Sequence, residues 1–332
     1  MVAGGALALL LCGAALAQTP PPEFRPLRAD YEQFMATMHR RHGFDLRWLH
    51  LLFSKLQPNQ SVIKAITAPS TAKPWYEFKP LFVDDSRILD GVRFWTDNAE
   101  ALARARQEFG VPEAIIVSIL GIETRYGRRT GNFRVAEALA TLAFDMPGRQ
   151  EYFQRELEYF LLLAREQRWD PWATKGSYAG AMGMAQFMPS SYRRQAIDYD
   201  GNGRINLWTE RADVIGSVAS YLRNAGWKDG LPVVLPARID RVDPKPLLDM
   251  GLKPAWPLEE WAQHGVQSTT PADNGLMASL FSLDLLGGPE FWLGLENFYA
   301  LIQYNRSRNY AMAVYQLAQE IERERGRTFT AP

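Results

Sequence analysis

The chain has 332 residues, of which 47% are hydrophobic and 12% aromatic, a composition that builds a sizeable core and excludes a wholly disordered protein. Its 37 Lys and Arg residues balance 37 Asp and Glu residues, so there is no global basic field to hold nucleic acid or an acidic membrane. At roughly 150 residues per domain the length indicates one large or two modest domains, and any partner must be recognised at a local site.

Residues 1–17 carry no charge and end in Ala15-Leu16-Ala17, an A-x-A cleavage pattern that precedes a proline-rich joint. This pattern predicts a secretory signal peptide and export to the periplasm. The single cysteine, Cys12, lies inside the leader, so we expect a mature chain without disulfides or a cysteine metal site. Leu11 stands where a small residue is expected before a lipidated cysteine, which disfavours an outer-membrane lipoprotein. No later stretch is apolar over the roughly 18 residues that a membrane span needs.

Apolar residues at spacings of three and four predict helices around Phe34 and Met38 and over residues 44–53. Three prolines predict a loop between Ala68 and Leu81 that carries Trp75 and Tyr76. Further helices are expected over residues 97–109, 112–125, 134–143, 149–166, 190–196 and 212–225.

Short β-branched runs broken by six prolines then predict a small β-rich insert over residues 228–272. Helical spacing returns at 291–303 and 309–325. The expected fold class is therefore mainly α (α+β): a helical body over 18–227, the insert, and C-terminal helices over 273–332 that complete the body.

Glu123 lies in the last turn of the helix that Pro112 opens and that Gly127 is placed to end. The negative end of the helix dipole and an aromatic-rich setting both raise a carboxyl pKa, as a general acid requires. The alternative is that Glu123 pairs with Arg125, or with another nearby arginine, on a solvated surface.

Residues 176–191 are rich in small side chains that let a ligand approach the backbone closely. Ser177, Tyr178 and Gln186 offer hydrogen bonds to hydroxyl or acetamido groups. A tight helix-packing seam explains the small residues equally well. Farther along, Tyr304, Asn305, Ser307 and Tyr310 surround an expected joint between two helices; helix capping is the alternative for the asparagine.

Residues 198–209 begin like a calcium loop, with side-chain oxygens at Asp198, Asp200 and Asn202 and Gly203 at the sharp turn. The closing position holds Thr209 in place of the bidentate glutamate. Either Glu210 or Asp213 supplies the closing carboxylate from a longer loop, or the loop is a metal-free Asx-turn.

Six segments, in this order, resemble the family of membrane-bound lytic transglycosylase B: GIETRYGR, EALATLAFD, GSYAGAMGMAQFMPSSY, DYDGNGRINLW, DVIGSVASYL and YNRSRNYAMAV. The resemblance covers nearly the whole mature chain and implies a lysozyme-like core within the helical body. It also implies cleavage of peptidoglycan between N-acetylmuramic acid and N-acetylglucosamine.

Carried over by position, the resemblance makes Glu123 the lone catalytic acid and base. Substrate contacts would come from Ser177 and Gln186 in the cleft beside Glu123, and from Tyr304, Asn305 and Tyr310. A structural calcium ion would bind Asp198, Asp200, Asn202, the carbonyl of Arg204, and Asp213, and no organic cofactor is implied.

In the implied reaction Glu123 protonates the glycosidic oxygen and then deprotonates the C6 hydroxyl, which closes a 1,6-anhydro ring without a second carboxylate. The expected partners are peptidoglycan glycan strands, with no nucleic acid, and the expected state is a monomer; the sequence leaves association with cell-wall enzyme complexes open. Two alternatives remain: a hydrolytic muramidase, and a calcium-dependent glycan-binding protein without turnover.

Overall fold

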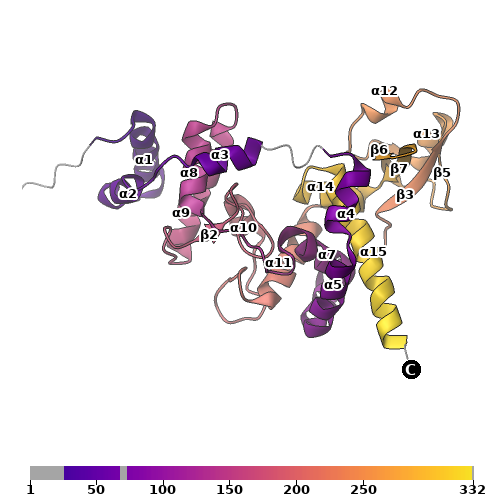
Figure 1. Ribbon diagram of the computed structural model, residues 1–332, viewed down its shortest axis with the longest axis horizontal. Helices are drawn as coiled ribbons and strands as arrows, with labels where there is room; N and C mark the ends of the chain where they lie inside the picture. The colour runs from indigo at the N-terminus through magenta and orange to yellow at the C-terminus, as the bar shows by residue number, and fades with distance from the viewer. Residues whose placement is uncertain (1–25, 68–72, 331–332) are drawn as a thin grey trace, which may run out of the picture. The chain divides into compact units, whose positions relative to one another are not determined.

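The computed structural model describes residues 26–67 and 73–330, with side chains up to residue 327. The chain divides into two compact parts, one ending at Lys55 and one beginning at Leu56, and each is described by itself (Figure 1). The expected signal peptide and Cys12 lie outside the described residues.

The smaller part contains α1 (Ala29–His42) and α2 (Leu46–Phe53), as the helical spacing predicts. Gly43 ends α1 with a φ of 66°, and the side chain of Asp45 caps α2 by accepting a hydrogen bond from the backbone of Trp48. Phe34 and Phe53 pack between the two helices with ring centroids 5.7 Å apart.

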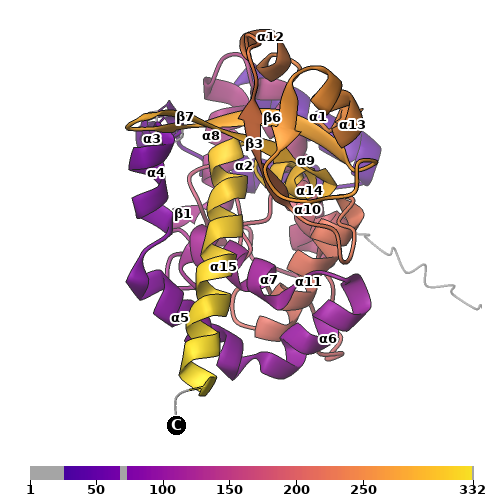
Figure 2. The same ribbon diagram turned by 90° about the vertical axis from the view of Figure 1, so that its right-hand side faces the viewer.

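The larger part is built around α7 (Glu113–Thr124), whose residues 114–122 are all buried. Four helices pack against it: α5 (Asp85–Asp97), α6 (Ala99–Phe109), α11 (Arg211–Asn224) and the long α15 (Arg308–Thr330). Figures 1 and 2 both show α15 beside α5 and α7. A helix that is apolar all round belongs in the centre of a bundle, because every face must be covered.

Shorter helices and a small two-stranded sheet complete this body. The helices are α3 (Gln60–Thr67), α4 (Trp75–Phe82), α8 (Val135–Asp145), α9 (Gln150–Glu166), α10 (Pro189–Gln195) and α14 (Glu296–Tyr304). The strands are β1 (Phe133–Arg134) and β2 (Lys175–Gly176), which pair antiparallel. The helices expected from residue 112 onward are confirmed, except that residues 291–295, which were expected to be helical, precede the start of α14.

The predicted loop between Ala68 and Leu81 is wrong over its second half, which forms α4, and the helix α5 was not predicted. Pro74 stands directly before the first turn of α4, where a proline is tolerated, and Pro80 lies within the helix. Trp75 and Phe78 are both buried and stack with centroids 6.2 Å apart. Burial of this apolar face therefore outweighs the cost of the proline.

A five-stranded antiparallel sheet follows α11, in the order β4-β6-β7-β3-β5. Its strands are β3 (Val234–Ile239), β4 (Trp256–Pro257), β5 (Val266–Ser268), β6 (Met277–Leu285) and β7 (Gly288–Gly294), and it also carries α12 (Lys245–Leu248) and α13 (Leu258–Gln263). The sheet thus continues beyond the expected 228–272, and the helix expected from Phe291 begins only at Glu296.

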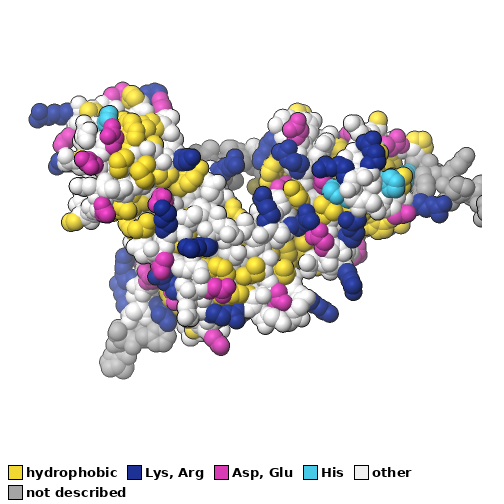
Figure 3. Space-filling view, turned by 180° about the vertical axis from the view of Figure 1, so that it is seen from behind, with side chains coloured by type: hydrophobic (Ala, Val, Ile, Leu, Met, Phe, Trp, Pro, Cys, Tyr) yellow, Lys and Arg dark blue, Asp and Glu magenta, His cyan; other side chains and the backbone are white. Residues whose placement is uncertain are grey.

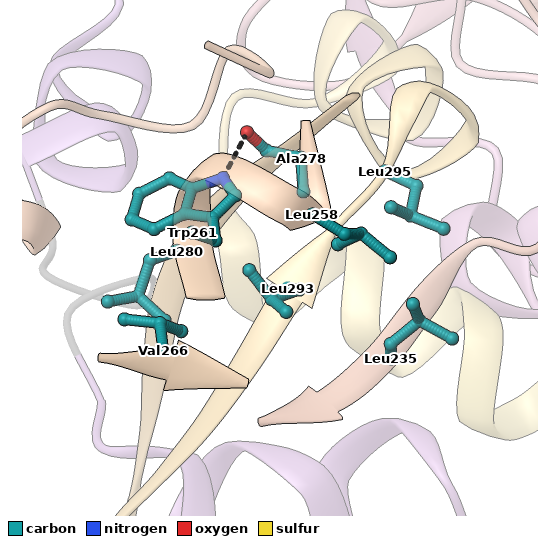
Figure 4. Close-up of a cluster of buried hydrophobic side chains, with 8 residues drawn as sticks. All are labelled: Leu235, Leu258, Trp261, Val266, Ala278, Leu280, Leu293 and Leu295. Atoms are coloured by element: carbon teal, nitrogen blue, oxygen red, sulfur yellow. Dashed lines mark hydrogen bonds between the residues drawn. The ribbon is translucent and has the colours of Figure 1, made fainter. Parts of the chain in front are cut away.

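The longest strand, β6, escapes prediction because residues 278–283 are buried on both faces of the sheet and so do not alternate. Beneath the sheet, α13 contributes Trp261 to a cluster of buried side chains with Leu235, Leu280 and Leu293 (Figure 4). The indole nitrogen of Trp261 donates to the carbonyl of Ala278 at 3.1 Å. This cluster gives the sheet its own core.

Basic and acidic side chains are interspersed over the face seen in Figure 3, as the balanced composition leads us to expect. None of the described helices has the length and apolar character needed to cross a bilayer.

Candidate active site

Glu123 is the next-to-last residue of α7 and keeps part of its surface open to solvent. The helix ends before Gly127, because Arg125 and Tyr126 both adopt left-handed conformations, with φ of 53° and 58°. This turn is uncommon for residues with side chains, and surrounding contacts hold it.

The carboxyl of Glu123 accepts a hydrogen bond from the hydroxyl of Tyr310 at 2.6 Å. Burial raises the pKa of Glu123 to about 7, against the opposing effect of the hydrogen bond from Tyr310. Burial and the neighbouring Glu123 carboxyl hold the pKa of Tyr310 well above its usual value, so Tyr310 remains a hydrogen-bond donor. The site therefore holds a carboxyl group that exchanges a proton near neutral pH.

The arginines that follow Glu123 pair with acidic side chains, one within α5 and one at the position directly before α5. Arg128 binds Asp90 at 2.9 Å, and Arg125 lies 3.6 Å from Asp84. Hydrogen bonding from Arg128 lowers the pKa of Asp90 despite its burial. Within the described residues no ion pair joins Glu123 to an arginine, so the alternative of a solvated surface pair is not what the structure shows.

Arg87 is buried and fastens the end of α7 to α5. Its Nε donates to the carbonyl of Gly121 at 3.0 Å, while the hydroxyl of Tyr126 donates to the carbonyl of Arg87 at 2.9 Å. These contacts hold the left-handed turn beside Glu123. Sequence reasoning missed Arg87 because the helix that carries it was not predicted.

The joint between α14 and α15 brings the predicted tyrosines to Glu123. The rings of Tyr304 and Tyr310 are stacked, 6.3 Å apart at 10°, and Tyr304 also packs 4.8 Å from Tyr221. Asn305 is exposed and forms the C-terminal cap position of α14. Ser307 precedes α15 and accepts a bond from the backbone of Tyr310.

The segment 176–191 packs against the end of α7. Thr124 donates through its hydroxyl to the carbonyl of Met184 at 2.9 Å, and Tyr304 donates to the carbonyl of Ala185 at 2.6 Å. Gln186 has a φ of 51°, and its amide nitrogen donates to the carbonyls of Thr130 and Gly183. Only the amide oxygen of Gln186 is then left for a ligand.

Ser177 begins the same segment, where its hydroxyl oxygen accepts hydrogen bonds from the backbones of Ala179 and Ala181. The glycines here make close backbone contacts within the protein. An added Cβ would lie 2.4 Å from the carbonyl of Leu207 at Gly183 and 2.2 Å from the carbonyl of Ala181 at Gly176. The small residues therefore form a packing seam, and Tyr178 lies beside it only partly buried.

Three carboxylates meet in the loop before α11. One oxygen from each of Asp198, Asp200 and Asp213 lies within 4.8 Å of the others. Asp213 is fully buried in the first turn of α11. Asn202 and Arg204 lie in the exposed part of the loop, where the Asn202 side chain accepts a bond from the Arg204 backbone.

This loop suits a hard divalent cation. Burial and the neighbouring Glu210 raise the pKa of Asp213, and one buried oxygen of Glu210 has no hydrogen-bond partner. Carboxylates brought together in this way repel one another unless a cation or a proton offsets their charge. Asp213 joins this group of carboxylates, whereas Thr209 stands at the usual closing position of a calcium loop.

Residues 27–319 match the family model described as the transglycosylase SLT domain. Membrane-bound lytic murein transglycosylase B of Escherichia coli (strain K12) is 43% identical over 300 residues, which cover 87% of this chain and 82% of that protein.

Solved structures agree with the fold. Soluble lytic transglycosylase SltB1 from Pseudomonas aeruginosa gives a TM-score of 0.84 at 47% identity, covering 90% of this chain and 99% of that chain. Escherichia coli Slt35 in complex with calcium gives a TM-score of 0.81 at 42% identity, covering 90% of this chain and 94% of that chain. SltB3 from Pseudomonas aeruginosa in complex with NAG-anhNAM-pentapeptide gives a TM-score of 0.76 at 30% identity, covering 88% of this chain and 79% of that chain.

These matches confirm the predicted mainly helical, lysozyme-like transglycosylase fold and the predicted resemblance. The chain belongs to the transglycosylase SLT domain family.

Proposed function

We propose that the protein is a lytic murein transglycosylase that cleaves the β-1,4 bond between N-acetylmuramic acid and N-acetylglucosamine in peptidoglycan, leaving 1,6-anhydromuramic acid ends. The observation that carries this proposal is the Glu123 carboxyl, whose pKa of about 7 leaves it substantially protonated at neutral pH. Related proteins named lytic transglycosylases, and the NAG-anhNAM-pentapeptide bound to SltB3, support the same reaction.

Glu123 acts first as the acid and then as the base. Its proton passes to the glycosidic oxygen as the bond to the anomeric carbon breaks, and the 2-acetamido group of the sugar supports the positive charge that develops there. The Glu123 carboxylate then takes the proton of the C6 hydroxyl, whose oxygen bonds to the anomeric carbon. One carboxyl group thus serves both steps, and the substrate supplies the nucleophile.

The neighbouring acids are poorly suited to a second role. Arg128 occupies both carboxylate oxygens of Asp90, and Asp84 pairs with Arg87 at 2.7 Å. A hydrolytic enzyme needs a second carboxylate as nucleophile or as base for water, in addition to the acid. This pairing favours transglycosylation over a hydrolytic muramidase.

The hydroxyl of Tyr310 positions the Glu123 carboxyl and stabilises its ionised form after proton transfer. Ser177, Gln186, Tyr304 and Asn305 provide the polar contacts to the sugars in this proposal. Peptidoglycan glycan strands are accordingly the partner.

The proposal includes a structural calcium ion held by Asp198, Asp200, Asn202, the carbonyl of Arg204, and Asp213. The carboxylates that meet in this loop, the unpartnered oxygen of Glu210 and the calcium complex of Slt35 support it. When bound, the ion neutralises the buried charge of Asp213 and so stabilises the loop that follows the Gln186 segment.

The test is a Glu123→Gln variant assayed on purified sacculi. We expect muropeptide release to fall by roughly 10²–10⁴-fold, the usual contribution of a general acid, while sacculus binding persists. Glu113→Gln, in the first turn of the same helix, is the matched control and should retain activity.

Mass spectrometry of the wild-type products then separates the candidate reactions. Anhydro ends, lighter by one water than reducing ends, are expected. Near-normal turnover by Glu123→Gln would refute the assignment of the acid, and reducing ends would identify a hydrolase.

A further inference from the structure

Thr124 follows Glu123 directly and is the last residue of α7, with only 1% of its surface exposed. Its hydroxyl donates to the carbonyl of Met184 at 2.9 Å and accepts a hydrogen bond from the backbone of Gly127 at 3.0 Å. The carbonyl of Leu120, to which a threonine in a helix commonly donates, lies farther away at 3.5 Å. Because a hydroxyl has one proton, the shorter bond to Met184 is the one that Thr124 makes.

Met184 is itself held in place. Its backbone nitrogen donates to the carbonyl of Leu207 at 2.6 Å. Its side chain lies against the turn that follows Glu123, since a Cβ added at Gly127 would come within 2.8 Å of the terminal methyl of Met184. Met184 and this turn are therefore packed in direct contact, and the hydroxyl of Thr124 is bonded to both.

The carbonyl of Ala185, next along the chain, is bonded to the joint between α14 and α15. It accepts a hydrogen bond from the hydroxyl of Tyr304 at 2.6 Å. The ring of Tyr304 stacks on that of Tyr310, whose hydroxyl donates to the Glu123 carboxyl at 2.6 Å. The contacts of Thr124 thus complete a closed circuit that begins and ends at Glu123.

We infer that Thr124 is a positioning residue: through the closed circuit, its hydroxyl holds the Glu123 carboxyl where the hydroxyl of Tyr310 donates to it. The importance of this role for catalysis rests on the proposed function. Helix ends fray, and Glu123 lies in the last turn of α7 before an uncommon left-handed turn. A reacting carboxyl must be held to within about 0.5 Å, so this helix end needs a contact from outside the helix.

Thr124→Val tests the inference, because it removes the hydroxyl at nearly unchanged shape. The Met184 carbonyl and the Gly127 backbone nitrogen then lose their partner. The Tyr310 bond, which favours the ionised carboxyl, should weaken, so the pKa of Glu123 should rise. The rise should be part of the roughly one to two pH units expected of Tyr310→Phe. NMR titration of the Glu123 carboxyl carbon, assigned by its absence from Glu123→Gln protein, measures this pKa without substrate.

Further variants show whether Thr124 acts through Tyr310. The double variant Thr124→Val, Tyr310→Phe should have the same Glu123 pKa as Tyr310→Phe alone, because no bond is left to position. Thr124→Ser keeps the hydroxyl and should restore a pKa close to that of the wild type. Tyr304→Phe breaks the closed circuit at Ala185 and should also raise the pKa, which keeps the test decisive if Thr124→Val does not fold.

Thr141→Val is the matched control. Thr141 is also 1% exposed, and its hydroxyl donates to the carbonyl of Glu137 at 2.8 Å and accepts from the backbone of Asn59 at 3.0 Å. Its replacement removes the same kinds of bond in α8, so it should leave the Glu123 pKa unchanged. An unchanged pKa in Thr124→Val, a further shift in the double variant, no rescue by Thr124→Ser, or an equal shift in Thr141→Val would each overturn the inference.

Turnover assays separate this inference from the proposed function. In the active enzyme, Thr124→Val should lower kcat by up to about 10²-fold, the scale of a misplacement near 1 Å, and should move the high-pH decline of kcat/KM upward. Wild-type kcat in Thr124→Val would overturn the inference. Failure of the wild-type chain to cleave any strand would refute the function instead, while the NMR titration would still show whether Thr124 positions the Glu123 carboxyl.

Discussion

Replacing Glu123 by glutamine should stabilise the folded protein at alkaline pH while it removes activity. The folded-state pKa of Glu123, about 7, lies above the ordinary value of 4.5, so the folded chain binds the proton more tightly than the unfolded chain. The contribution of Glu123 to wild-type stability is therefore greatest below pH 4.5 and is lost as the pH rises through 7. A glutamine is neutral at every pH, and its carbonyl oxygen still accepts the bond from Tyr310.

The gap of roughly 2.5 pH units corresponds to about 3 kcal/mol at 1.36 kcal/mol per unit. This is an upper bound, because part of the Glu123 side chain contacts solvent. Glu123→Gln should therefore exceed the wild type in unfolding free energy by up to about 3 kcal/mol at pH 8 and by little at pH 4.

Thermal unfolding followed by circular dichroism at pH 4, 6 and 8 measures the effect. Glu113→Gln is the control: its carboxylate lies at the favourable end of the α7 dipole, so removing it should cost a few tenths of a kcal/mol with no growth between pH 6 and 8. A stability difference for Glu123→Gln that is flat with pH, or that is larger at pH 4 than at pH 8, would contradict the burial of a protonated carboxyl.

Tyr310→Phe should raise the pKa of Glu123, because it removes a hydrogen bond that favours the ionised form; a bond to a charged group contributes about 1.5–3 kcal/mol, or roughly one to two pH units. Since the acid must be protonated, the high-pH decline of kcat/KM should move to higher pH, and a decline at the wild-type pH would refute this role of Tyr310. Calcium at a hundredfold excess over Kd should stabilise the chain by about 2.7 kcal/mol, and Asp198→Ala or Asp213→Asn should erase most of the rise in Tm. In protein that is still folded, a chelator should leave most cleavage activity at low temperature, and calcium that leaves the melting curve unchanged would contradict the proposed site. Mass spectrometry of exported protein should find a mature N-terminus near Gln18, whereas acylated Cys12 in detergent extracts would show a lipoprotein.

The sequence alone determined the features that depend on neighbouring residues. The apolar run from Ile115 to Ile122 and the proline before it predict α7 and place Glu123 in its last turn, as the structure confirms. The spacing of Asp198 and Asp200 likewise predicts a loop that gathers carboxylates. These patterns are legible because a helix turn or a metal loop is built from residues a few positions apart.

Tertiary structure decided what surrounds those residues. Tyr310 reaches Glu123 from 187 positions away, and Arg87 fastens the end of α7 from a helix whose spacing did not reveal it. The strand β6 was missed because burial on both faces removes the alternation that marks a strand. Desolvation is likewise a property of the assembled surroundings: the sequence indicates that the pKa of Glu123 could rise, but only the packing of distant side chains around its carboxyl raises it to about 7.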